Sequence, residues 1–119
     1  MPSLEVEDLA RLTDIVTFGE RAIRHLGDAS LEAFLADEKT FDSVIRCVQV
    51  VGEAAWRIGR SVQVSYPEIA WLQVAGMRHR LVHDYGEVDP AIAYRAVTTH
   101  LPELIRRVRS ILDRYHEAR

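Results

Sequence analysis

Cysteine is nearly absent from this chain, because Cys47 is the only one among 119 residues. It cannot form an internal disulfide, and a single thiolate excludes a cysteine-rich zinc site. Cys47 stands in an apolar stretch of the sequence, so we expect a buried thiol that serves only in packing.

Long apolar runs are also missing, since no stretch approaches the roughly 20 residues that a membrane-spanning helix needs. The first eight residues lack the basic start and the apolar stretch of a secretory signal. We therefore expect a cytoplasmic protein that makes no contact with a membrane. The length is that of one domain, and we assign residues 1–119 to it.

Lysine is as rare as cysteine, because 14 of the 15 basic residues are arginine and Lys39 is the exception. The formal net charge is −3, so no overall field attracts a nucleic acid. The charge is uneven, however, with −5 over residues 1–40 and +2 over residues 41–119. Arginine binds phosphate and carboxylate through two parallel hydrogen bonds, so the second part of the chain has room for a local anion site.

Apolar residues recur at helical spacing along most of the chain. The pattern predicts helices over residues 4–26, 31–36, 41–59, 67–82 and 90–116, with a connector over 59–66. We expect Leu31, Phe34 and Leu35 to be buried, and Pro102 to kink or break the last helix. The small residues around Gly52 would let another helix approach closely. The fold class that follows is all-α, a bundle of four or five helices with short connections.

Residues 77–85, Met-Arg-His-Arg-Leu-Val-His-Asp-Tyr, gather ionisable side chains at the end of a largely apolar helix. Histidine titrates nearest to neutral pH and can move a proton, whereas arginine stabilises phosphate oxygens and developing charge. A metal-independent ribonuclease needs these two functions, a base for the RNA 2′-hydroxyl and a cation for the transition state. Arg78 and His83 are the candidates for them.

Helix geometry constrains this hypothesis. On an ideal helix Arg78 and Tyr85 share nearly the same face, whereas Arg78 and His83 lie about 140° apart. Arg78 and His83 can meet on one ligand only if the helix ends near Val82 or if a second subunit completes the site. From the spacing alone, the simpler explanation is that these residues make helix caps and surface ion pairs.

A metal site is a further interpretation of the same segment. His79 and His83 are four residues apart and share a helix face, which suits zinc, and Asp84 could be a third ligand. No glutamate stands where the helix of a metalloprotease would have one. We expect neither a metal nor another cofactor.

Three stretches carry a resemblance to a known family. They are residues 50–55 (Val-Val-Gly-Glu-Ala-Ala), residues 66–71 (Tyr-Pro-Glu-Ile-Ala-Trp) and residues 77–85. In this order they resemble the Gly-Glu-Ala element, the Pro-x-Ile-x-Trp helix entry and the Arg-x4-His-x-Tyr motif of the HepT-like branch of the HEPN superfamily. Residues 101–104 (Leu-Pro-Glu-Leu) are similar to the final helix of that branch, which is the toxin side of HepT/MntA toxin–antitoxin modules.

The resemblance implies an all-α HEPN fold, a homodimer and metal-independent endoribonuclease activity on RNA. It assigns catalysis to Arg78 and His83, with two copies of the pair meeting across the dimer groove. His79 stands where the family commonly has asparagine, and we expect a supporting role for it. Tyr85 matches the tyrosine to which, in some systems, a partner nucleotidyltransferase (MntA) transfers AMP and so silences the toxin. The added bulk and negative charge, two residues from His83, would block an RNA phosphate.

Two matched residues have a second interpretation. Glu53 could face the groove and orient Arg78, or it could make an internal ion pair or helix contact, which is the interpretation we favour. Trp71 could stack on a base, but beside Ile69 and Leu72 a core position is the simpler explanation.

The arginines near the C-terminus also have two interpretations. They could follow an RNA backbone, or they could form a solvated face that pairs with Glu103 and Asp113. We favour the solvated face. The residues concerned are Arg106, Arg107, Arg109 and Arg114.

The function predicted is that of a toxin with ribonuclease activity, neutralised by AMP transfer to Tyr85. The alternative is a non-catalytic partner of a nucleotidyltransferase, either an antitoxin or a substrate-binding subunit. A groove lined by arginine and histidine suits an anionic ligand in both cases. A domain that binds ATP or GTP without cleavage is a further, weaker alternative.

Overall fold

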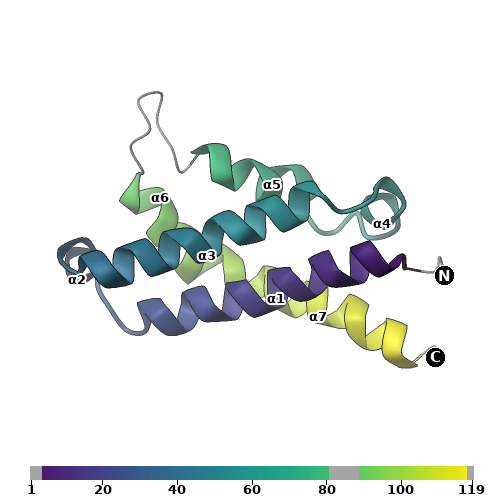
Figure 1. Ribbon diagram of the computed structural model, residues 1–119, viewed down its shortest axis with the longest axis horizontal. Coiled ribbons are helices and arrows are strands. Elements are labelled where there is room, and N and C mark those ends of the chain that lie inside the picture. Colours follow the sequence, from purple (N-terminus) through teal and green to yellow (C-terminus); the bar gives the residue numbers. More distant parts are fainter. Residues whose placement is uncertain (1–3, 81–88, 118–119) are drawn as a thin grey trace.

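The computed structural model describes residues 4–80 and 89–117, which form a bundle of helices (Figure 1). Neither of these two ranges contains a strand, and the all-α fold class predicted from the sequence is confirmed. None of their helices is long and apolar enough to cross a membrane. In chain order the elements are α1 (Val6–Leu26), α2 (Leu31–Ala36), α3 (Glu38–Trp56), α4 (Arg60–Ser65), α5 (Trp71–Arg80), α6 (Pro90–Arg95), the π-helical turn η1 (Ala96–His100) and α7 (Leu101–Glu117).

The two longest helices, α1 and α3, lie side by side and form the centre of the bundle (Figure 1). α7 packs along α1, whereas α5 packs along α3. The short helices α2 and α4 lie at opposite ends of α3 (Figure 1). Because α1 and α5 cover only part of α3, one face of this helix stays in contact with solvent.

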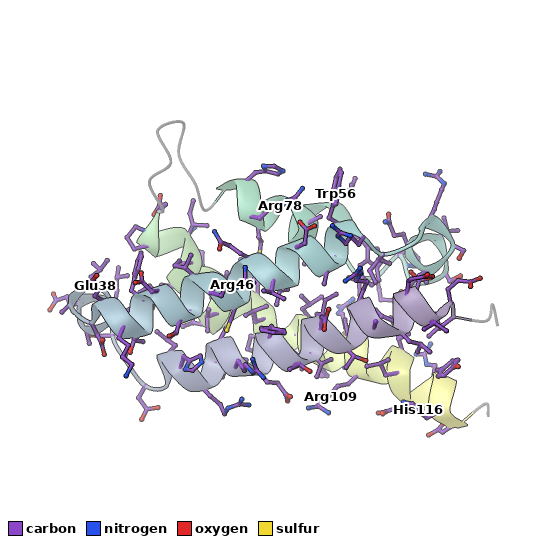
Figure 2. All side chains as sticks on the ribbon, in the orientation of Figure 1. Glu38, Arg46, Trp56, Arg78, Arg109 and His116 are labelled. Carbon is purple, nitrogen blue, oxygen red and sulfur yellow. The ribbon has the colours of Figure 1, made fainter. Side chains whose placement is uncertain are left out.

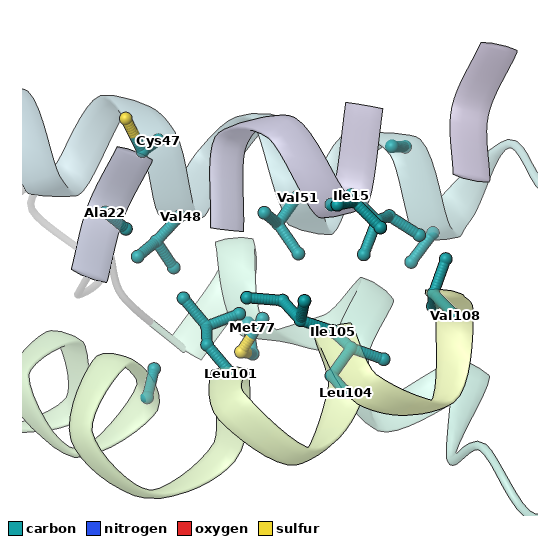
Figure 3. Close-up of a cluster of buried hydrophobic side chains, with 14 of the residues drawn as sticks. Ile15, Ala22, Cys47, Val48, Val51, Met77, Leu101, Leu104, Ile105 and Val108 are labelled. Carbon is teal, nitrogen blue, oxygen red and sulfur yellow. The ribbon is translucent and has the colours of Figure 1, made fainter. Parts of the chain in front are cut away.

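The core lies where α1, α3 and α7 meet (Figure 3). Most of the core side chains are branched aliphatic ones, and their burial is the main favourable contribution to folding. Cys47 is 5% exposed and belongs to this core, as the sequence predicts. The side chains that are fully buried include Leu12, Ile15, Val44, Val48, Val51, Leu101 and Val108.

The predicted bounds of α2 are confirmed, and the Ser30 hydroxyl caps the helix by accepting a hydrogen bond from the backbone N–H of Ala33. The burial predicted for this helix is wrong in part. Phe34 is fully buried, but Leu31 is 37% exposed and Leu35 is 50% exposed. A helix of six residues presents little more than one position to its neighbours, and Phe34 occupies it, beside the rings of Phe41 and Tyr94.

The start of α3 differs from the predicted residue 41, because the side chain of Asp37 caps the helix. The Asp37 carboxylate accepts hydrogen bonds from the Thr40 N–H at 3.2 Å and from the Thr40 hydroxyl at 2.8 Å. Two bonds to one carboxylate fix the first turn, so α3 begins at Glu38 instead of Phe41.

The connector predicted over residues 59–66 is wrong, because most of it is the short helix α4. Val62 is the one residue of α4 that is buried. A six-residue helix with a single buried position has no apolar period that a sequence pattern could reveal. The predicted second long helix is correspondingly too long, since α3 ends at Trp56 and not at Gly59.

The start of α5 also differs from the prediction, because the helix begins at Trp71 and not at Pro67. The preceding residues form a turn in which the carbonyl of Tyr66 accepts two hydrogen bonds. One comes from the N–H of Ile69 at 3.2 Å and the other from the indole N–H of Trp71 at 3.0 Å. Trp71 is 5% exposed, so the core position that we favour for it is confirmed.

The break predicted at Pro102 is present as the π-helical turn η1, directly before α7. Proline has no N–H, so Pro102 cannot donate to the carbonyl four residues before it. The chain widens instead, and the N–H of Leu101 donates to the carbonyl of Ala96, five residues earlier. The last predicted helix is therefore divided into α6, η1 and α7.

Asp8 ties the start of α1 to the start of α4. It is the one charged side chain among the described residues that is buried, with 6% exposed. Its carboxylate accepts a hydrogen bond of 2.8 Å from the N–H of Gly59, which has no side chain to cap α4 itself. A Cβ added at Gly59 would lie 3.2 Å from the Asp8 Oδ1, so the contact leaves little room for another residue.

Replacement of Asp8 by alanine should lower the free energy of unfolding by about 1 to 2 kcal/mol, because the Gly59 N–H loses its acceptor. Urea denaturation measures the change. Asp113→Ala is the matched control, since Asp113 is an exposed carboxylate on α7, and its effect should stay within about 0.5 kcal/mol. Equal stability of the two variants would contradict the role given to Asp8.

Candidate functional site

α5 approaches α3 closely because Gly52 has no side chain. A Cβ added at Gly52 would lie 3.4 Å from the backbone nitrogen and the Cβ of Arg78, and 3.5 Å from the carbonyl oxygen of Val74. A methyl group would fill that space completely, and a larger side chain would push the helices apart. The close approach predicted at Gly52 is thus confirmed, and it holds the backbone of Arg78 against α3.

The side chain of Arg78 pairs with Glu53, one residue beyond Gly52 on α3. Arg78 Nη1 donates to Glu53 Oε2, and Arg57 Nε donates to Glu53 Oε1 at 2.8 Å. The hydrogen bond from Arg57, together with the charge of Arg78, holds the pKa of Glu53 below its ordinary value. Both contacts considered for Glu53 therefore exist, one with Arg57 at the C-terminal cap of its own helix and one with Arg78.

Trp56 lies against the same guanidinium, and Figure 2 shows Arg78 of α5 and Trp56 of α3 on the same side of the molecule. The Arg78 Cζ is 5.4 Å from the centre of the Trp56 ring, within the range of a cation–π interaction. Trp56 is nevertheless 59% exposed, which is unusual for tryptophan.

The Nε–H of Arg78 is buried and has no hydrogen-bond partner among the residues that the structure describes. A buried donor left without any partner costs roughly 1–3 kcal/mol. Such groups in folded proteins call for an explanation, and a functional role is one of the common ones.

Arg78 lies in a groove of about 860 Å³ between α1, α3 and α5, which we call the Arg78 groove. Among the described residues, three arginines and two carboxylates line it, and the ion pair between Arg11 and Asp14 is loose, at 3.9 Å. The excess of positive charge suits an anionic ligand. The residues that line it are Arg11, Asp14, Arg46, Gln49, Val50, Glu53, Ala54, Arg78 and His79.

A second cavity, of about 690 Å³, lies between α5 and the segment formed by α6, η1 and α7. The described residues on its walls include Arg95, Arg107 and His100, together with the acids Glu68 and Glu103. Of the predicted site residues that the structure describes, namely Glu53, Arg78 and His79, none lines this cavity. The Arg78 groove is therefore the candidate site.

The structure brings together three of the predicted site residues, since Arg78, Glu53 and His79 all line the Arg78 groove. His83, Asp84 and Tyr85 lie outside the described residues, so the predicted convergence of Arg78 and His83 stays a prediction.

Sequence reasoning missed Trp56 and Arg46, although a signal for both was present. Trp56 stands three residues after Glu53, and Arg46 stands seven residues before it. A helix therefore places all three on one face. The position of Glu53 on this face of the helix therefore predicts that Arg46 and Trp56 lie near the site.

The C-terminal arginines mostly pair with acids on the surface, as we favour. Arg106 and Arg107 both bond to Glu103, and these hydrogen bonds lower the pKa of Glu103 to about 2. Arg109 pairs with Glu20 of α1, which is neither of the two acids expected to pair with this group. The fourth member, Arg114, lies 5.9 Å from the centre of the Tyr66 ring.

Comparison with known proteins connects this geometry to a family. The family described as Ribonuclease HepT-like matches residues 8–111. A candidate RNase of Methanocaldococcus jannaschii is 30% identical over 117 residues, which cover 98% of this chain and 99% of the relative. A second candidate RNase of that organism is 29% identical over 112 residues, or 94% of this chain and 91% of the relative.

A protein of Thermococcus cleftensis named as a probable ribonuclease HepT is 33% identical over 99 residues, which cover 83% of this chain and 84% of the relative. No solved structure gives a significant match to the chain. The family match spans most of the chain and includes every residue that lines the Arg78 groove. The chain belongs to the ribonuclease HepT-like family.

Proposed function

We propose that this protein is a metal-independent endoribonuclease that acts as the toxin of a toxin–antitoxin module. The observation that carries the proposal is the fixed position of Arg78, paired with Glu53 at the edge of a groove with excess positive charge. The match to the ribonuclease HepT-like family supports it, as do the relatives named for RNase activity. We assign residues 1–119 to a single domain of this kind.

The proposed reaction divides the chemistry between two residues. His83 removes the proton of the RNA 2′-hydroxyl, and the resulting oxygen attacks the adjacent phosphorus while the bond to the 5′-oxygen of the next nucleotide breaks. The leaving oxygen takes up a proton, so a cyclic phosphate and a 5′-hydroxyl result. Arg78 stabilises the negative charge on the phosphate oxygens in the transition state. His79, on the wall of the groove, supports the binding of the phosphate.

Arg78→Ala should reduce the rate of RNA cleavage by about 100- to 1,000-fold, because a positioned donor to the transition state is lost. His83→Ala should reduce it by about 100- to 10,000-fold, because proton transfer is lost. Both rates are measured with a labelled single-stranded RNA in the presence of excess EDTA, in which the native protein should retain its activity.

Arg24→Ala and His25→Ala are the matched controls for these variants. They remove the same two side-chain types from the last turn of α1, outside the Arg78 groove. Both should cleave RNA at the native rate. Full activity of His83→Ala would contradict the proposal, and no cleavage by the native protein would favour a non-catalytic partner of a nucleotidyltransferase.

Glu53 is proposed as a positioning residue, because it holds the guanidinium of Arg78 without a place of its own in the reaction. Glu53→Gln should lower kcat/KM for RNA by about 10- to 100-fold, the size expected when a catalytic group is displaced. Glu103→Gln is the control, since Glu103 also pairs with two arginines, on α7 and away from the Arg78 groove. An equal loss in both variants would show a general effect of removing paired acids.

We also propose that the active form is a homodimer and that a nucleotidyltransferase of the MntA type neutralises it by transferring AMP to Tyr85. An AMP group adds bulk and negative charge, and both oppose the approach of an RNA phosphate. On an ideal continuous helix Arg78 and His83 would lie about 140° apart, and a second copy of the chain is one of the two ways in which such a pair can meet on one ligand.

Co-expression with such a nucleotidyltransferase should add AMP to this protein and suppress its cleavage of RNA. Tyr85→Phe removes the accepting hydroxyl, so this variant should stay unmodified and active in the same cells. Intact-mass spectrometry measures the modification, and Tyr115→Phe, on α7, is the control that should still accept AMP. Modification of Tyr85→Phe to the native extent would exclude Tyr85 as the site.

A further inference from the structure

Trp56 is the most conspicuous side chain that the proposed reaction does not use. It ends α3, contacts the guanidinium of Arg78 and still exposes 59% of its surface. Burying an indole stabilises a protein, so an indole left in solvent beside a candidate catalytic residue calls for a binding role.

Trp56 lies next to the Arg78 groove, because it contacts Arg78 on the groove's wall, although Trp56 itself does not line the groove. Arg46, Gln49 and Glu53 line the groove from the same face of α3, at helical spacing from Trp56. At 1.5 Å per residue, Arg46 and Trp56 are about 15 Å apart along the helix axis. The Trp56 ring could bind a base and the Arg46 guanidinium a phosphate. The distance between them corresponds to a short segment of nucleic acid.

Arg46 is available for such a segment. It is exposed, lines the groove, and makes no hydrogen bond or ion pair with any other residue that the structure describes. The other arginines of the groove differ, since Arg11 pairs with Asp14 and Arg78 pairs with Glu53. An arginine that has no partner among the described residues, in a groove with excess positive charge, suits a phosphate.

We propose that Trp56 stacks on a base of single-stranded RNA whose backbone follows the Arg78 groove toward Arg46. Every base has an aromatic face, so stacking holds the strand without selecting a sequence, while arginines hold the phosphates. In duplex RNA each base is already stacked, so Trp56 restricts the site to unpaired RNA. The inference rests on the ribonuclease function proposed above and defines its substrate class.

Tryptophan and arginine are enriched in protein interfaces as well as in sites for single-stranded nucleic acid. RNA is favoured here because Trp56 lies against Arg78, the residue to which the proposed cleavage is assigned. A second arginine, Arg57, follows Trp56 in the chain. A single aromatic ring among cations is typical of sites for single-stranded nucleic acid.

The test measures binding separately from cleavage. A fluorescently labelled, single-stranded 2′-O-methyl RNA of mixed sequence cannot be cleaved by attack of the 2′-oxygen, so fluorescence anisotropy gives its Kd. Trp56→Leu should raise the Kd about tenfold or more, because leucine keeps the apolar surface but cannot stack. Trp56→Phe keeps an aromatic ring and should recover most of the affinity. Arg46→Ala should also raise the Kd. The difference in affinity between this variant and the native protein should become smaller as salt is added.

Intrinsic fluorescence gives a second measurement in the same titration. The chain has two tryptophans, and Trp71 is 5% exposed and bonded to the Tyr66 carbonyl. Quenching by the oligonucleotide should therefore come from Trp56 and be absent in Trp56→Phe. Leu72→Ala is the control for loss of an exposed apolar side chain, since Leu72 is 78% exposed on α5, and it should bind as the native protein does.

Two results would overturn the inference while the proposed function stands. One is a native protein that cleaves RNA together with an unchanged Kd in Trp56→Leu. The other is a change in molar mass, measured by light scattering, that accounts for the weaker binding, because Trp56 would then act at a contact between copies of the chain. Failure of the native protein to bind the oligonucleotide would overturn the inference and the proposed function together.

Discussion

The contact between α3 and α5 at Gly52 is the constraint on which the candidate site depends. It brings the backbone of Arg78 to the distance at which its side chain reaches Glu53 and the ring of Trp56. Gly52, Glu53 and Trp56 come from one stretch of α3. The close approach at Gly52 therefore also sets the contacts of Arg78 with Glu53 and Trp56. A side chain larger than a methyl group at Gly52 would separate the helices and change all of them together.

α3 serves the core and the site through two faces of one helix. Val44, Val48 and Val51 are fully buried, whereas Arg46 and Trp56 are exposed on the other face. The buried face is fixed by packing against α1, so the exposed face inherits the rigidity of the core. Polar groups that must hold a precise geometry are best placed on such an element.

The sequence predicts those parts of the fold that depend on local patterns. The bounds of α2, the burial of Cys47 and the break before Pro102 follow from caps, apolar period and the missing N–H of proline. The start of α5 does not, because the indole of Trp71 bonds to the Tyr66 carbonyl and holds the preceding residues in a turn. The contact between Arg78 and Glu53 was among the alternatives that the family motifs offered, whereas the contact of Arg78 with Trp56 was not predictable, since it joins residues far apart in the chain and Trp56 lies outside the motifs.

Because Arg78 is held in place before any substrate arrives, the entropy cost of binding is lower. A free arginine side chain loses up to about 2 kcal/mol of conformational entropy when a ligand fixes it. In this protein Glu53 and Trp56 already hold the guanidinium, so folding meets that cost and binding does not. The low pKa of Glu53 keeps the carboxylate charged, and the pair intact, at any pH above the range in which Glu53 takes up a proton. A phosphate in the groove must then share the Arg78 guanidinium with the Glu53 carboxylate or displace that carboxylate. This favours ligands that carry negative charge on several oxygens, as the transition state of RNA cleavage does.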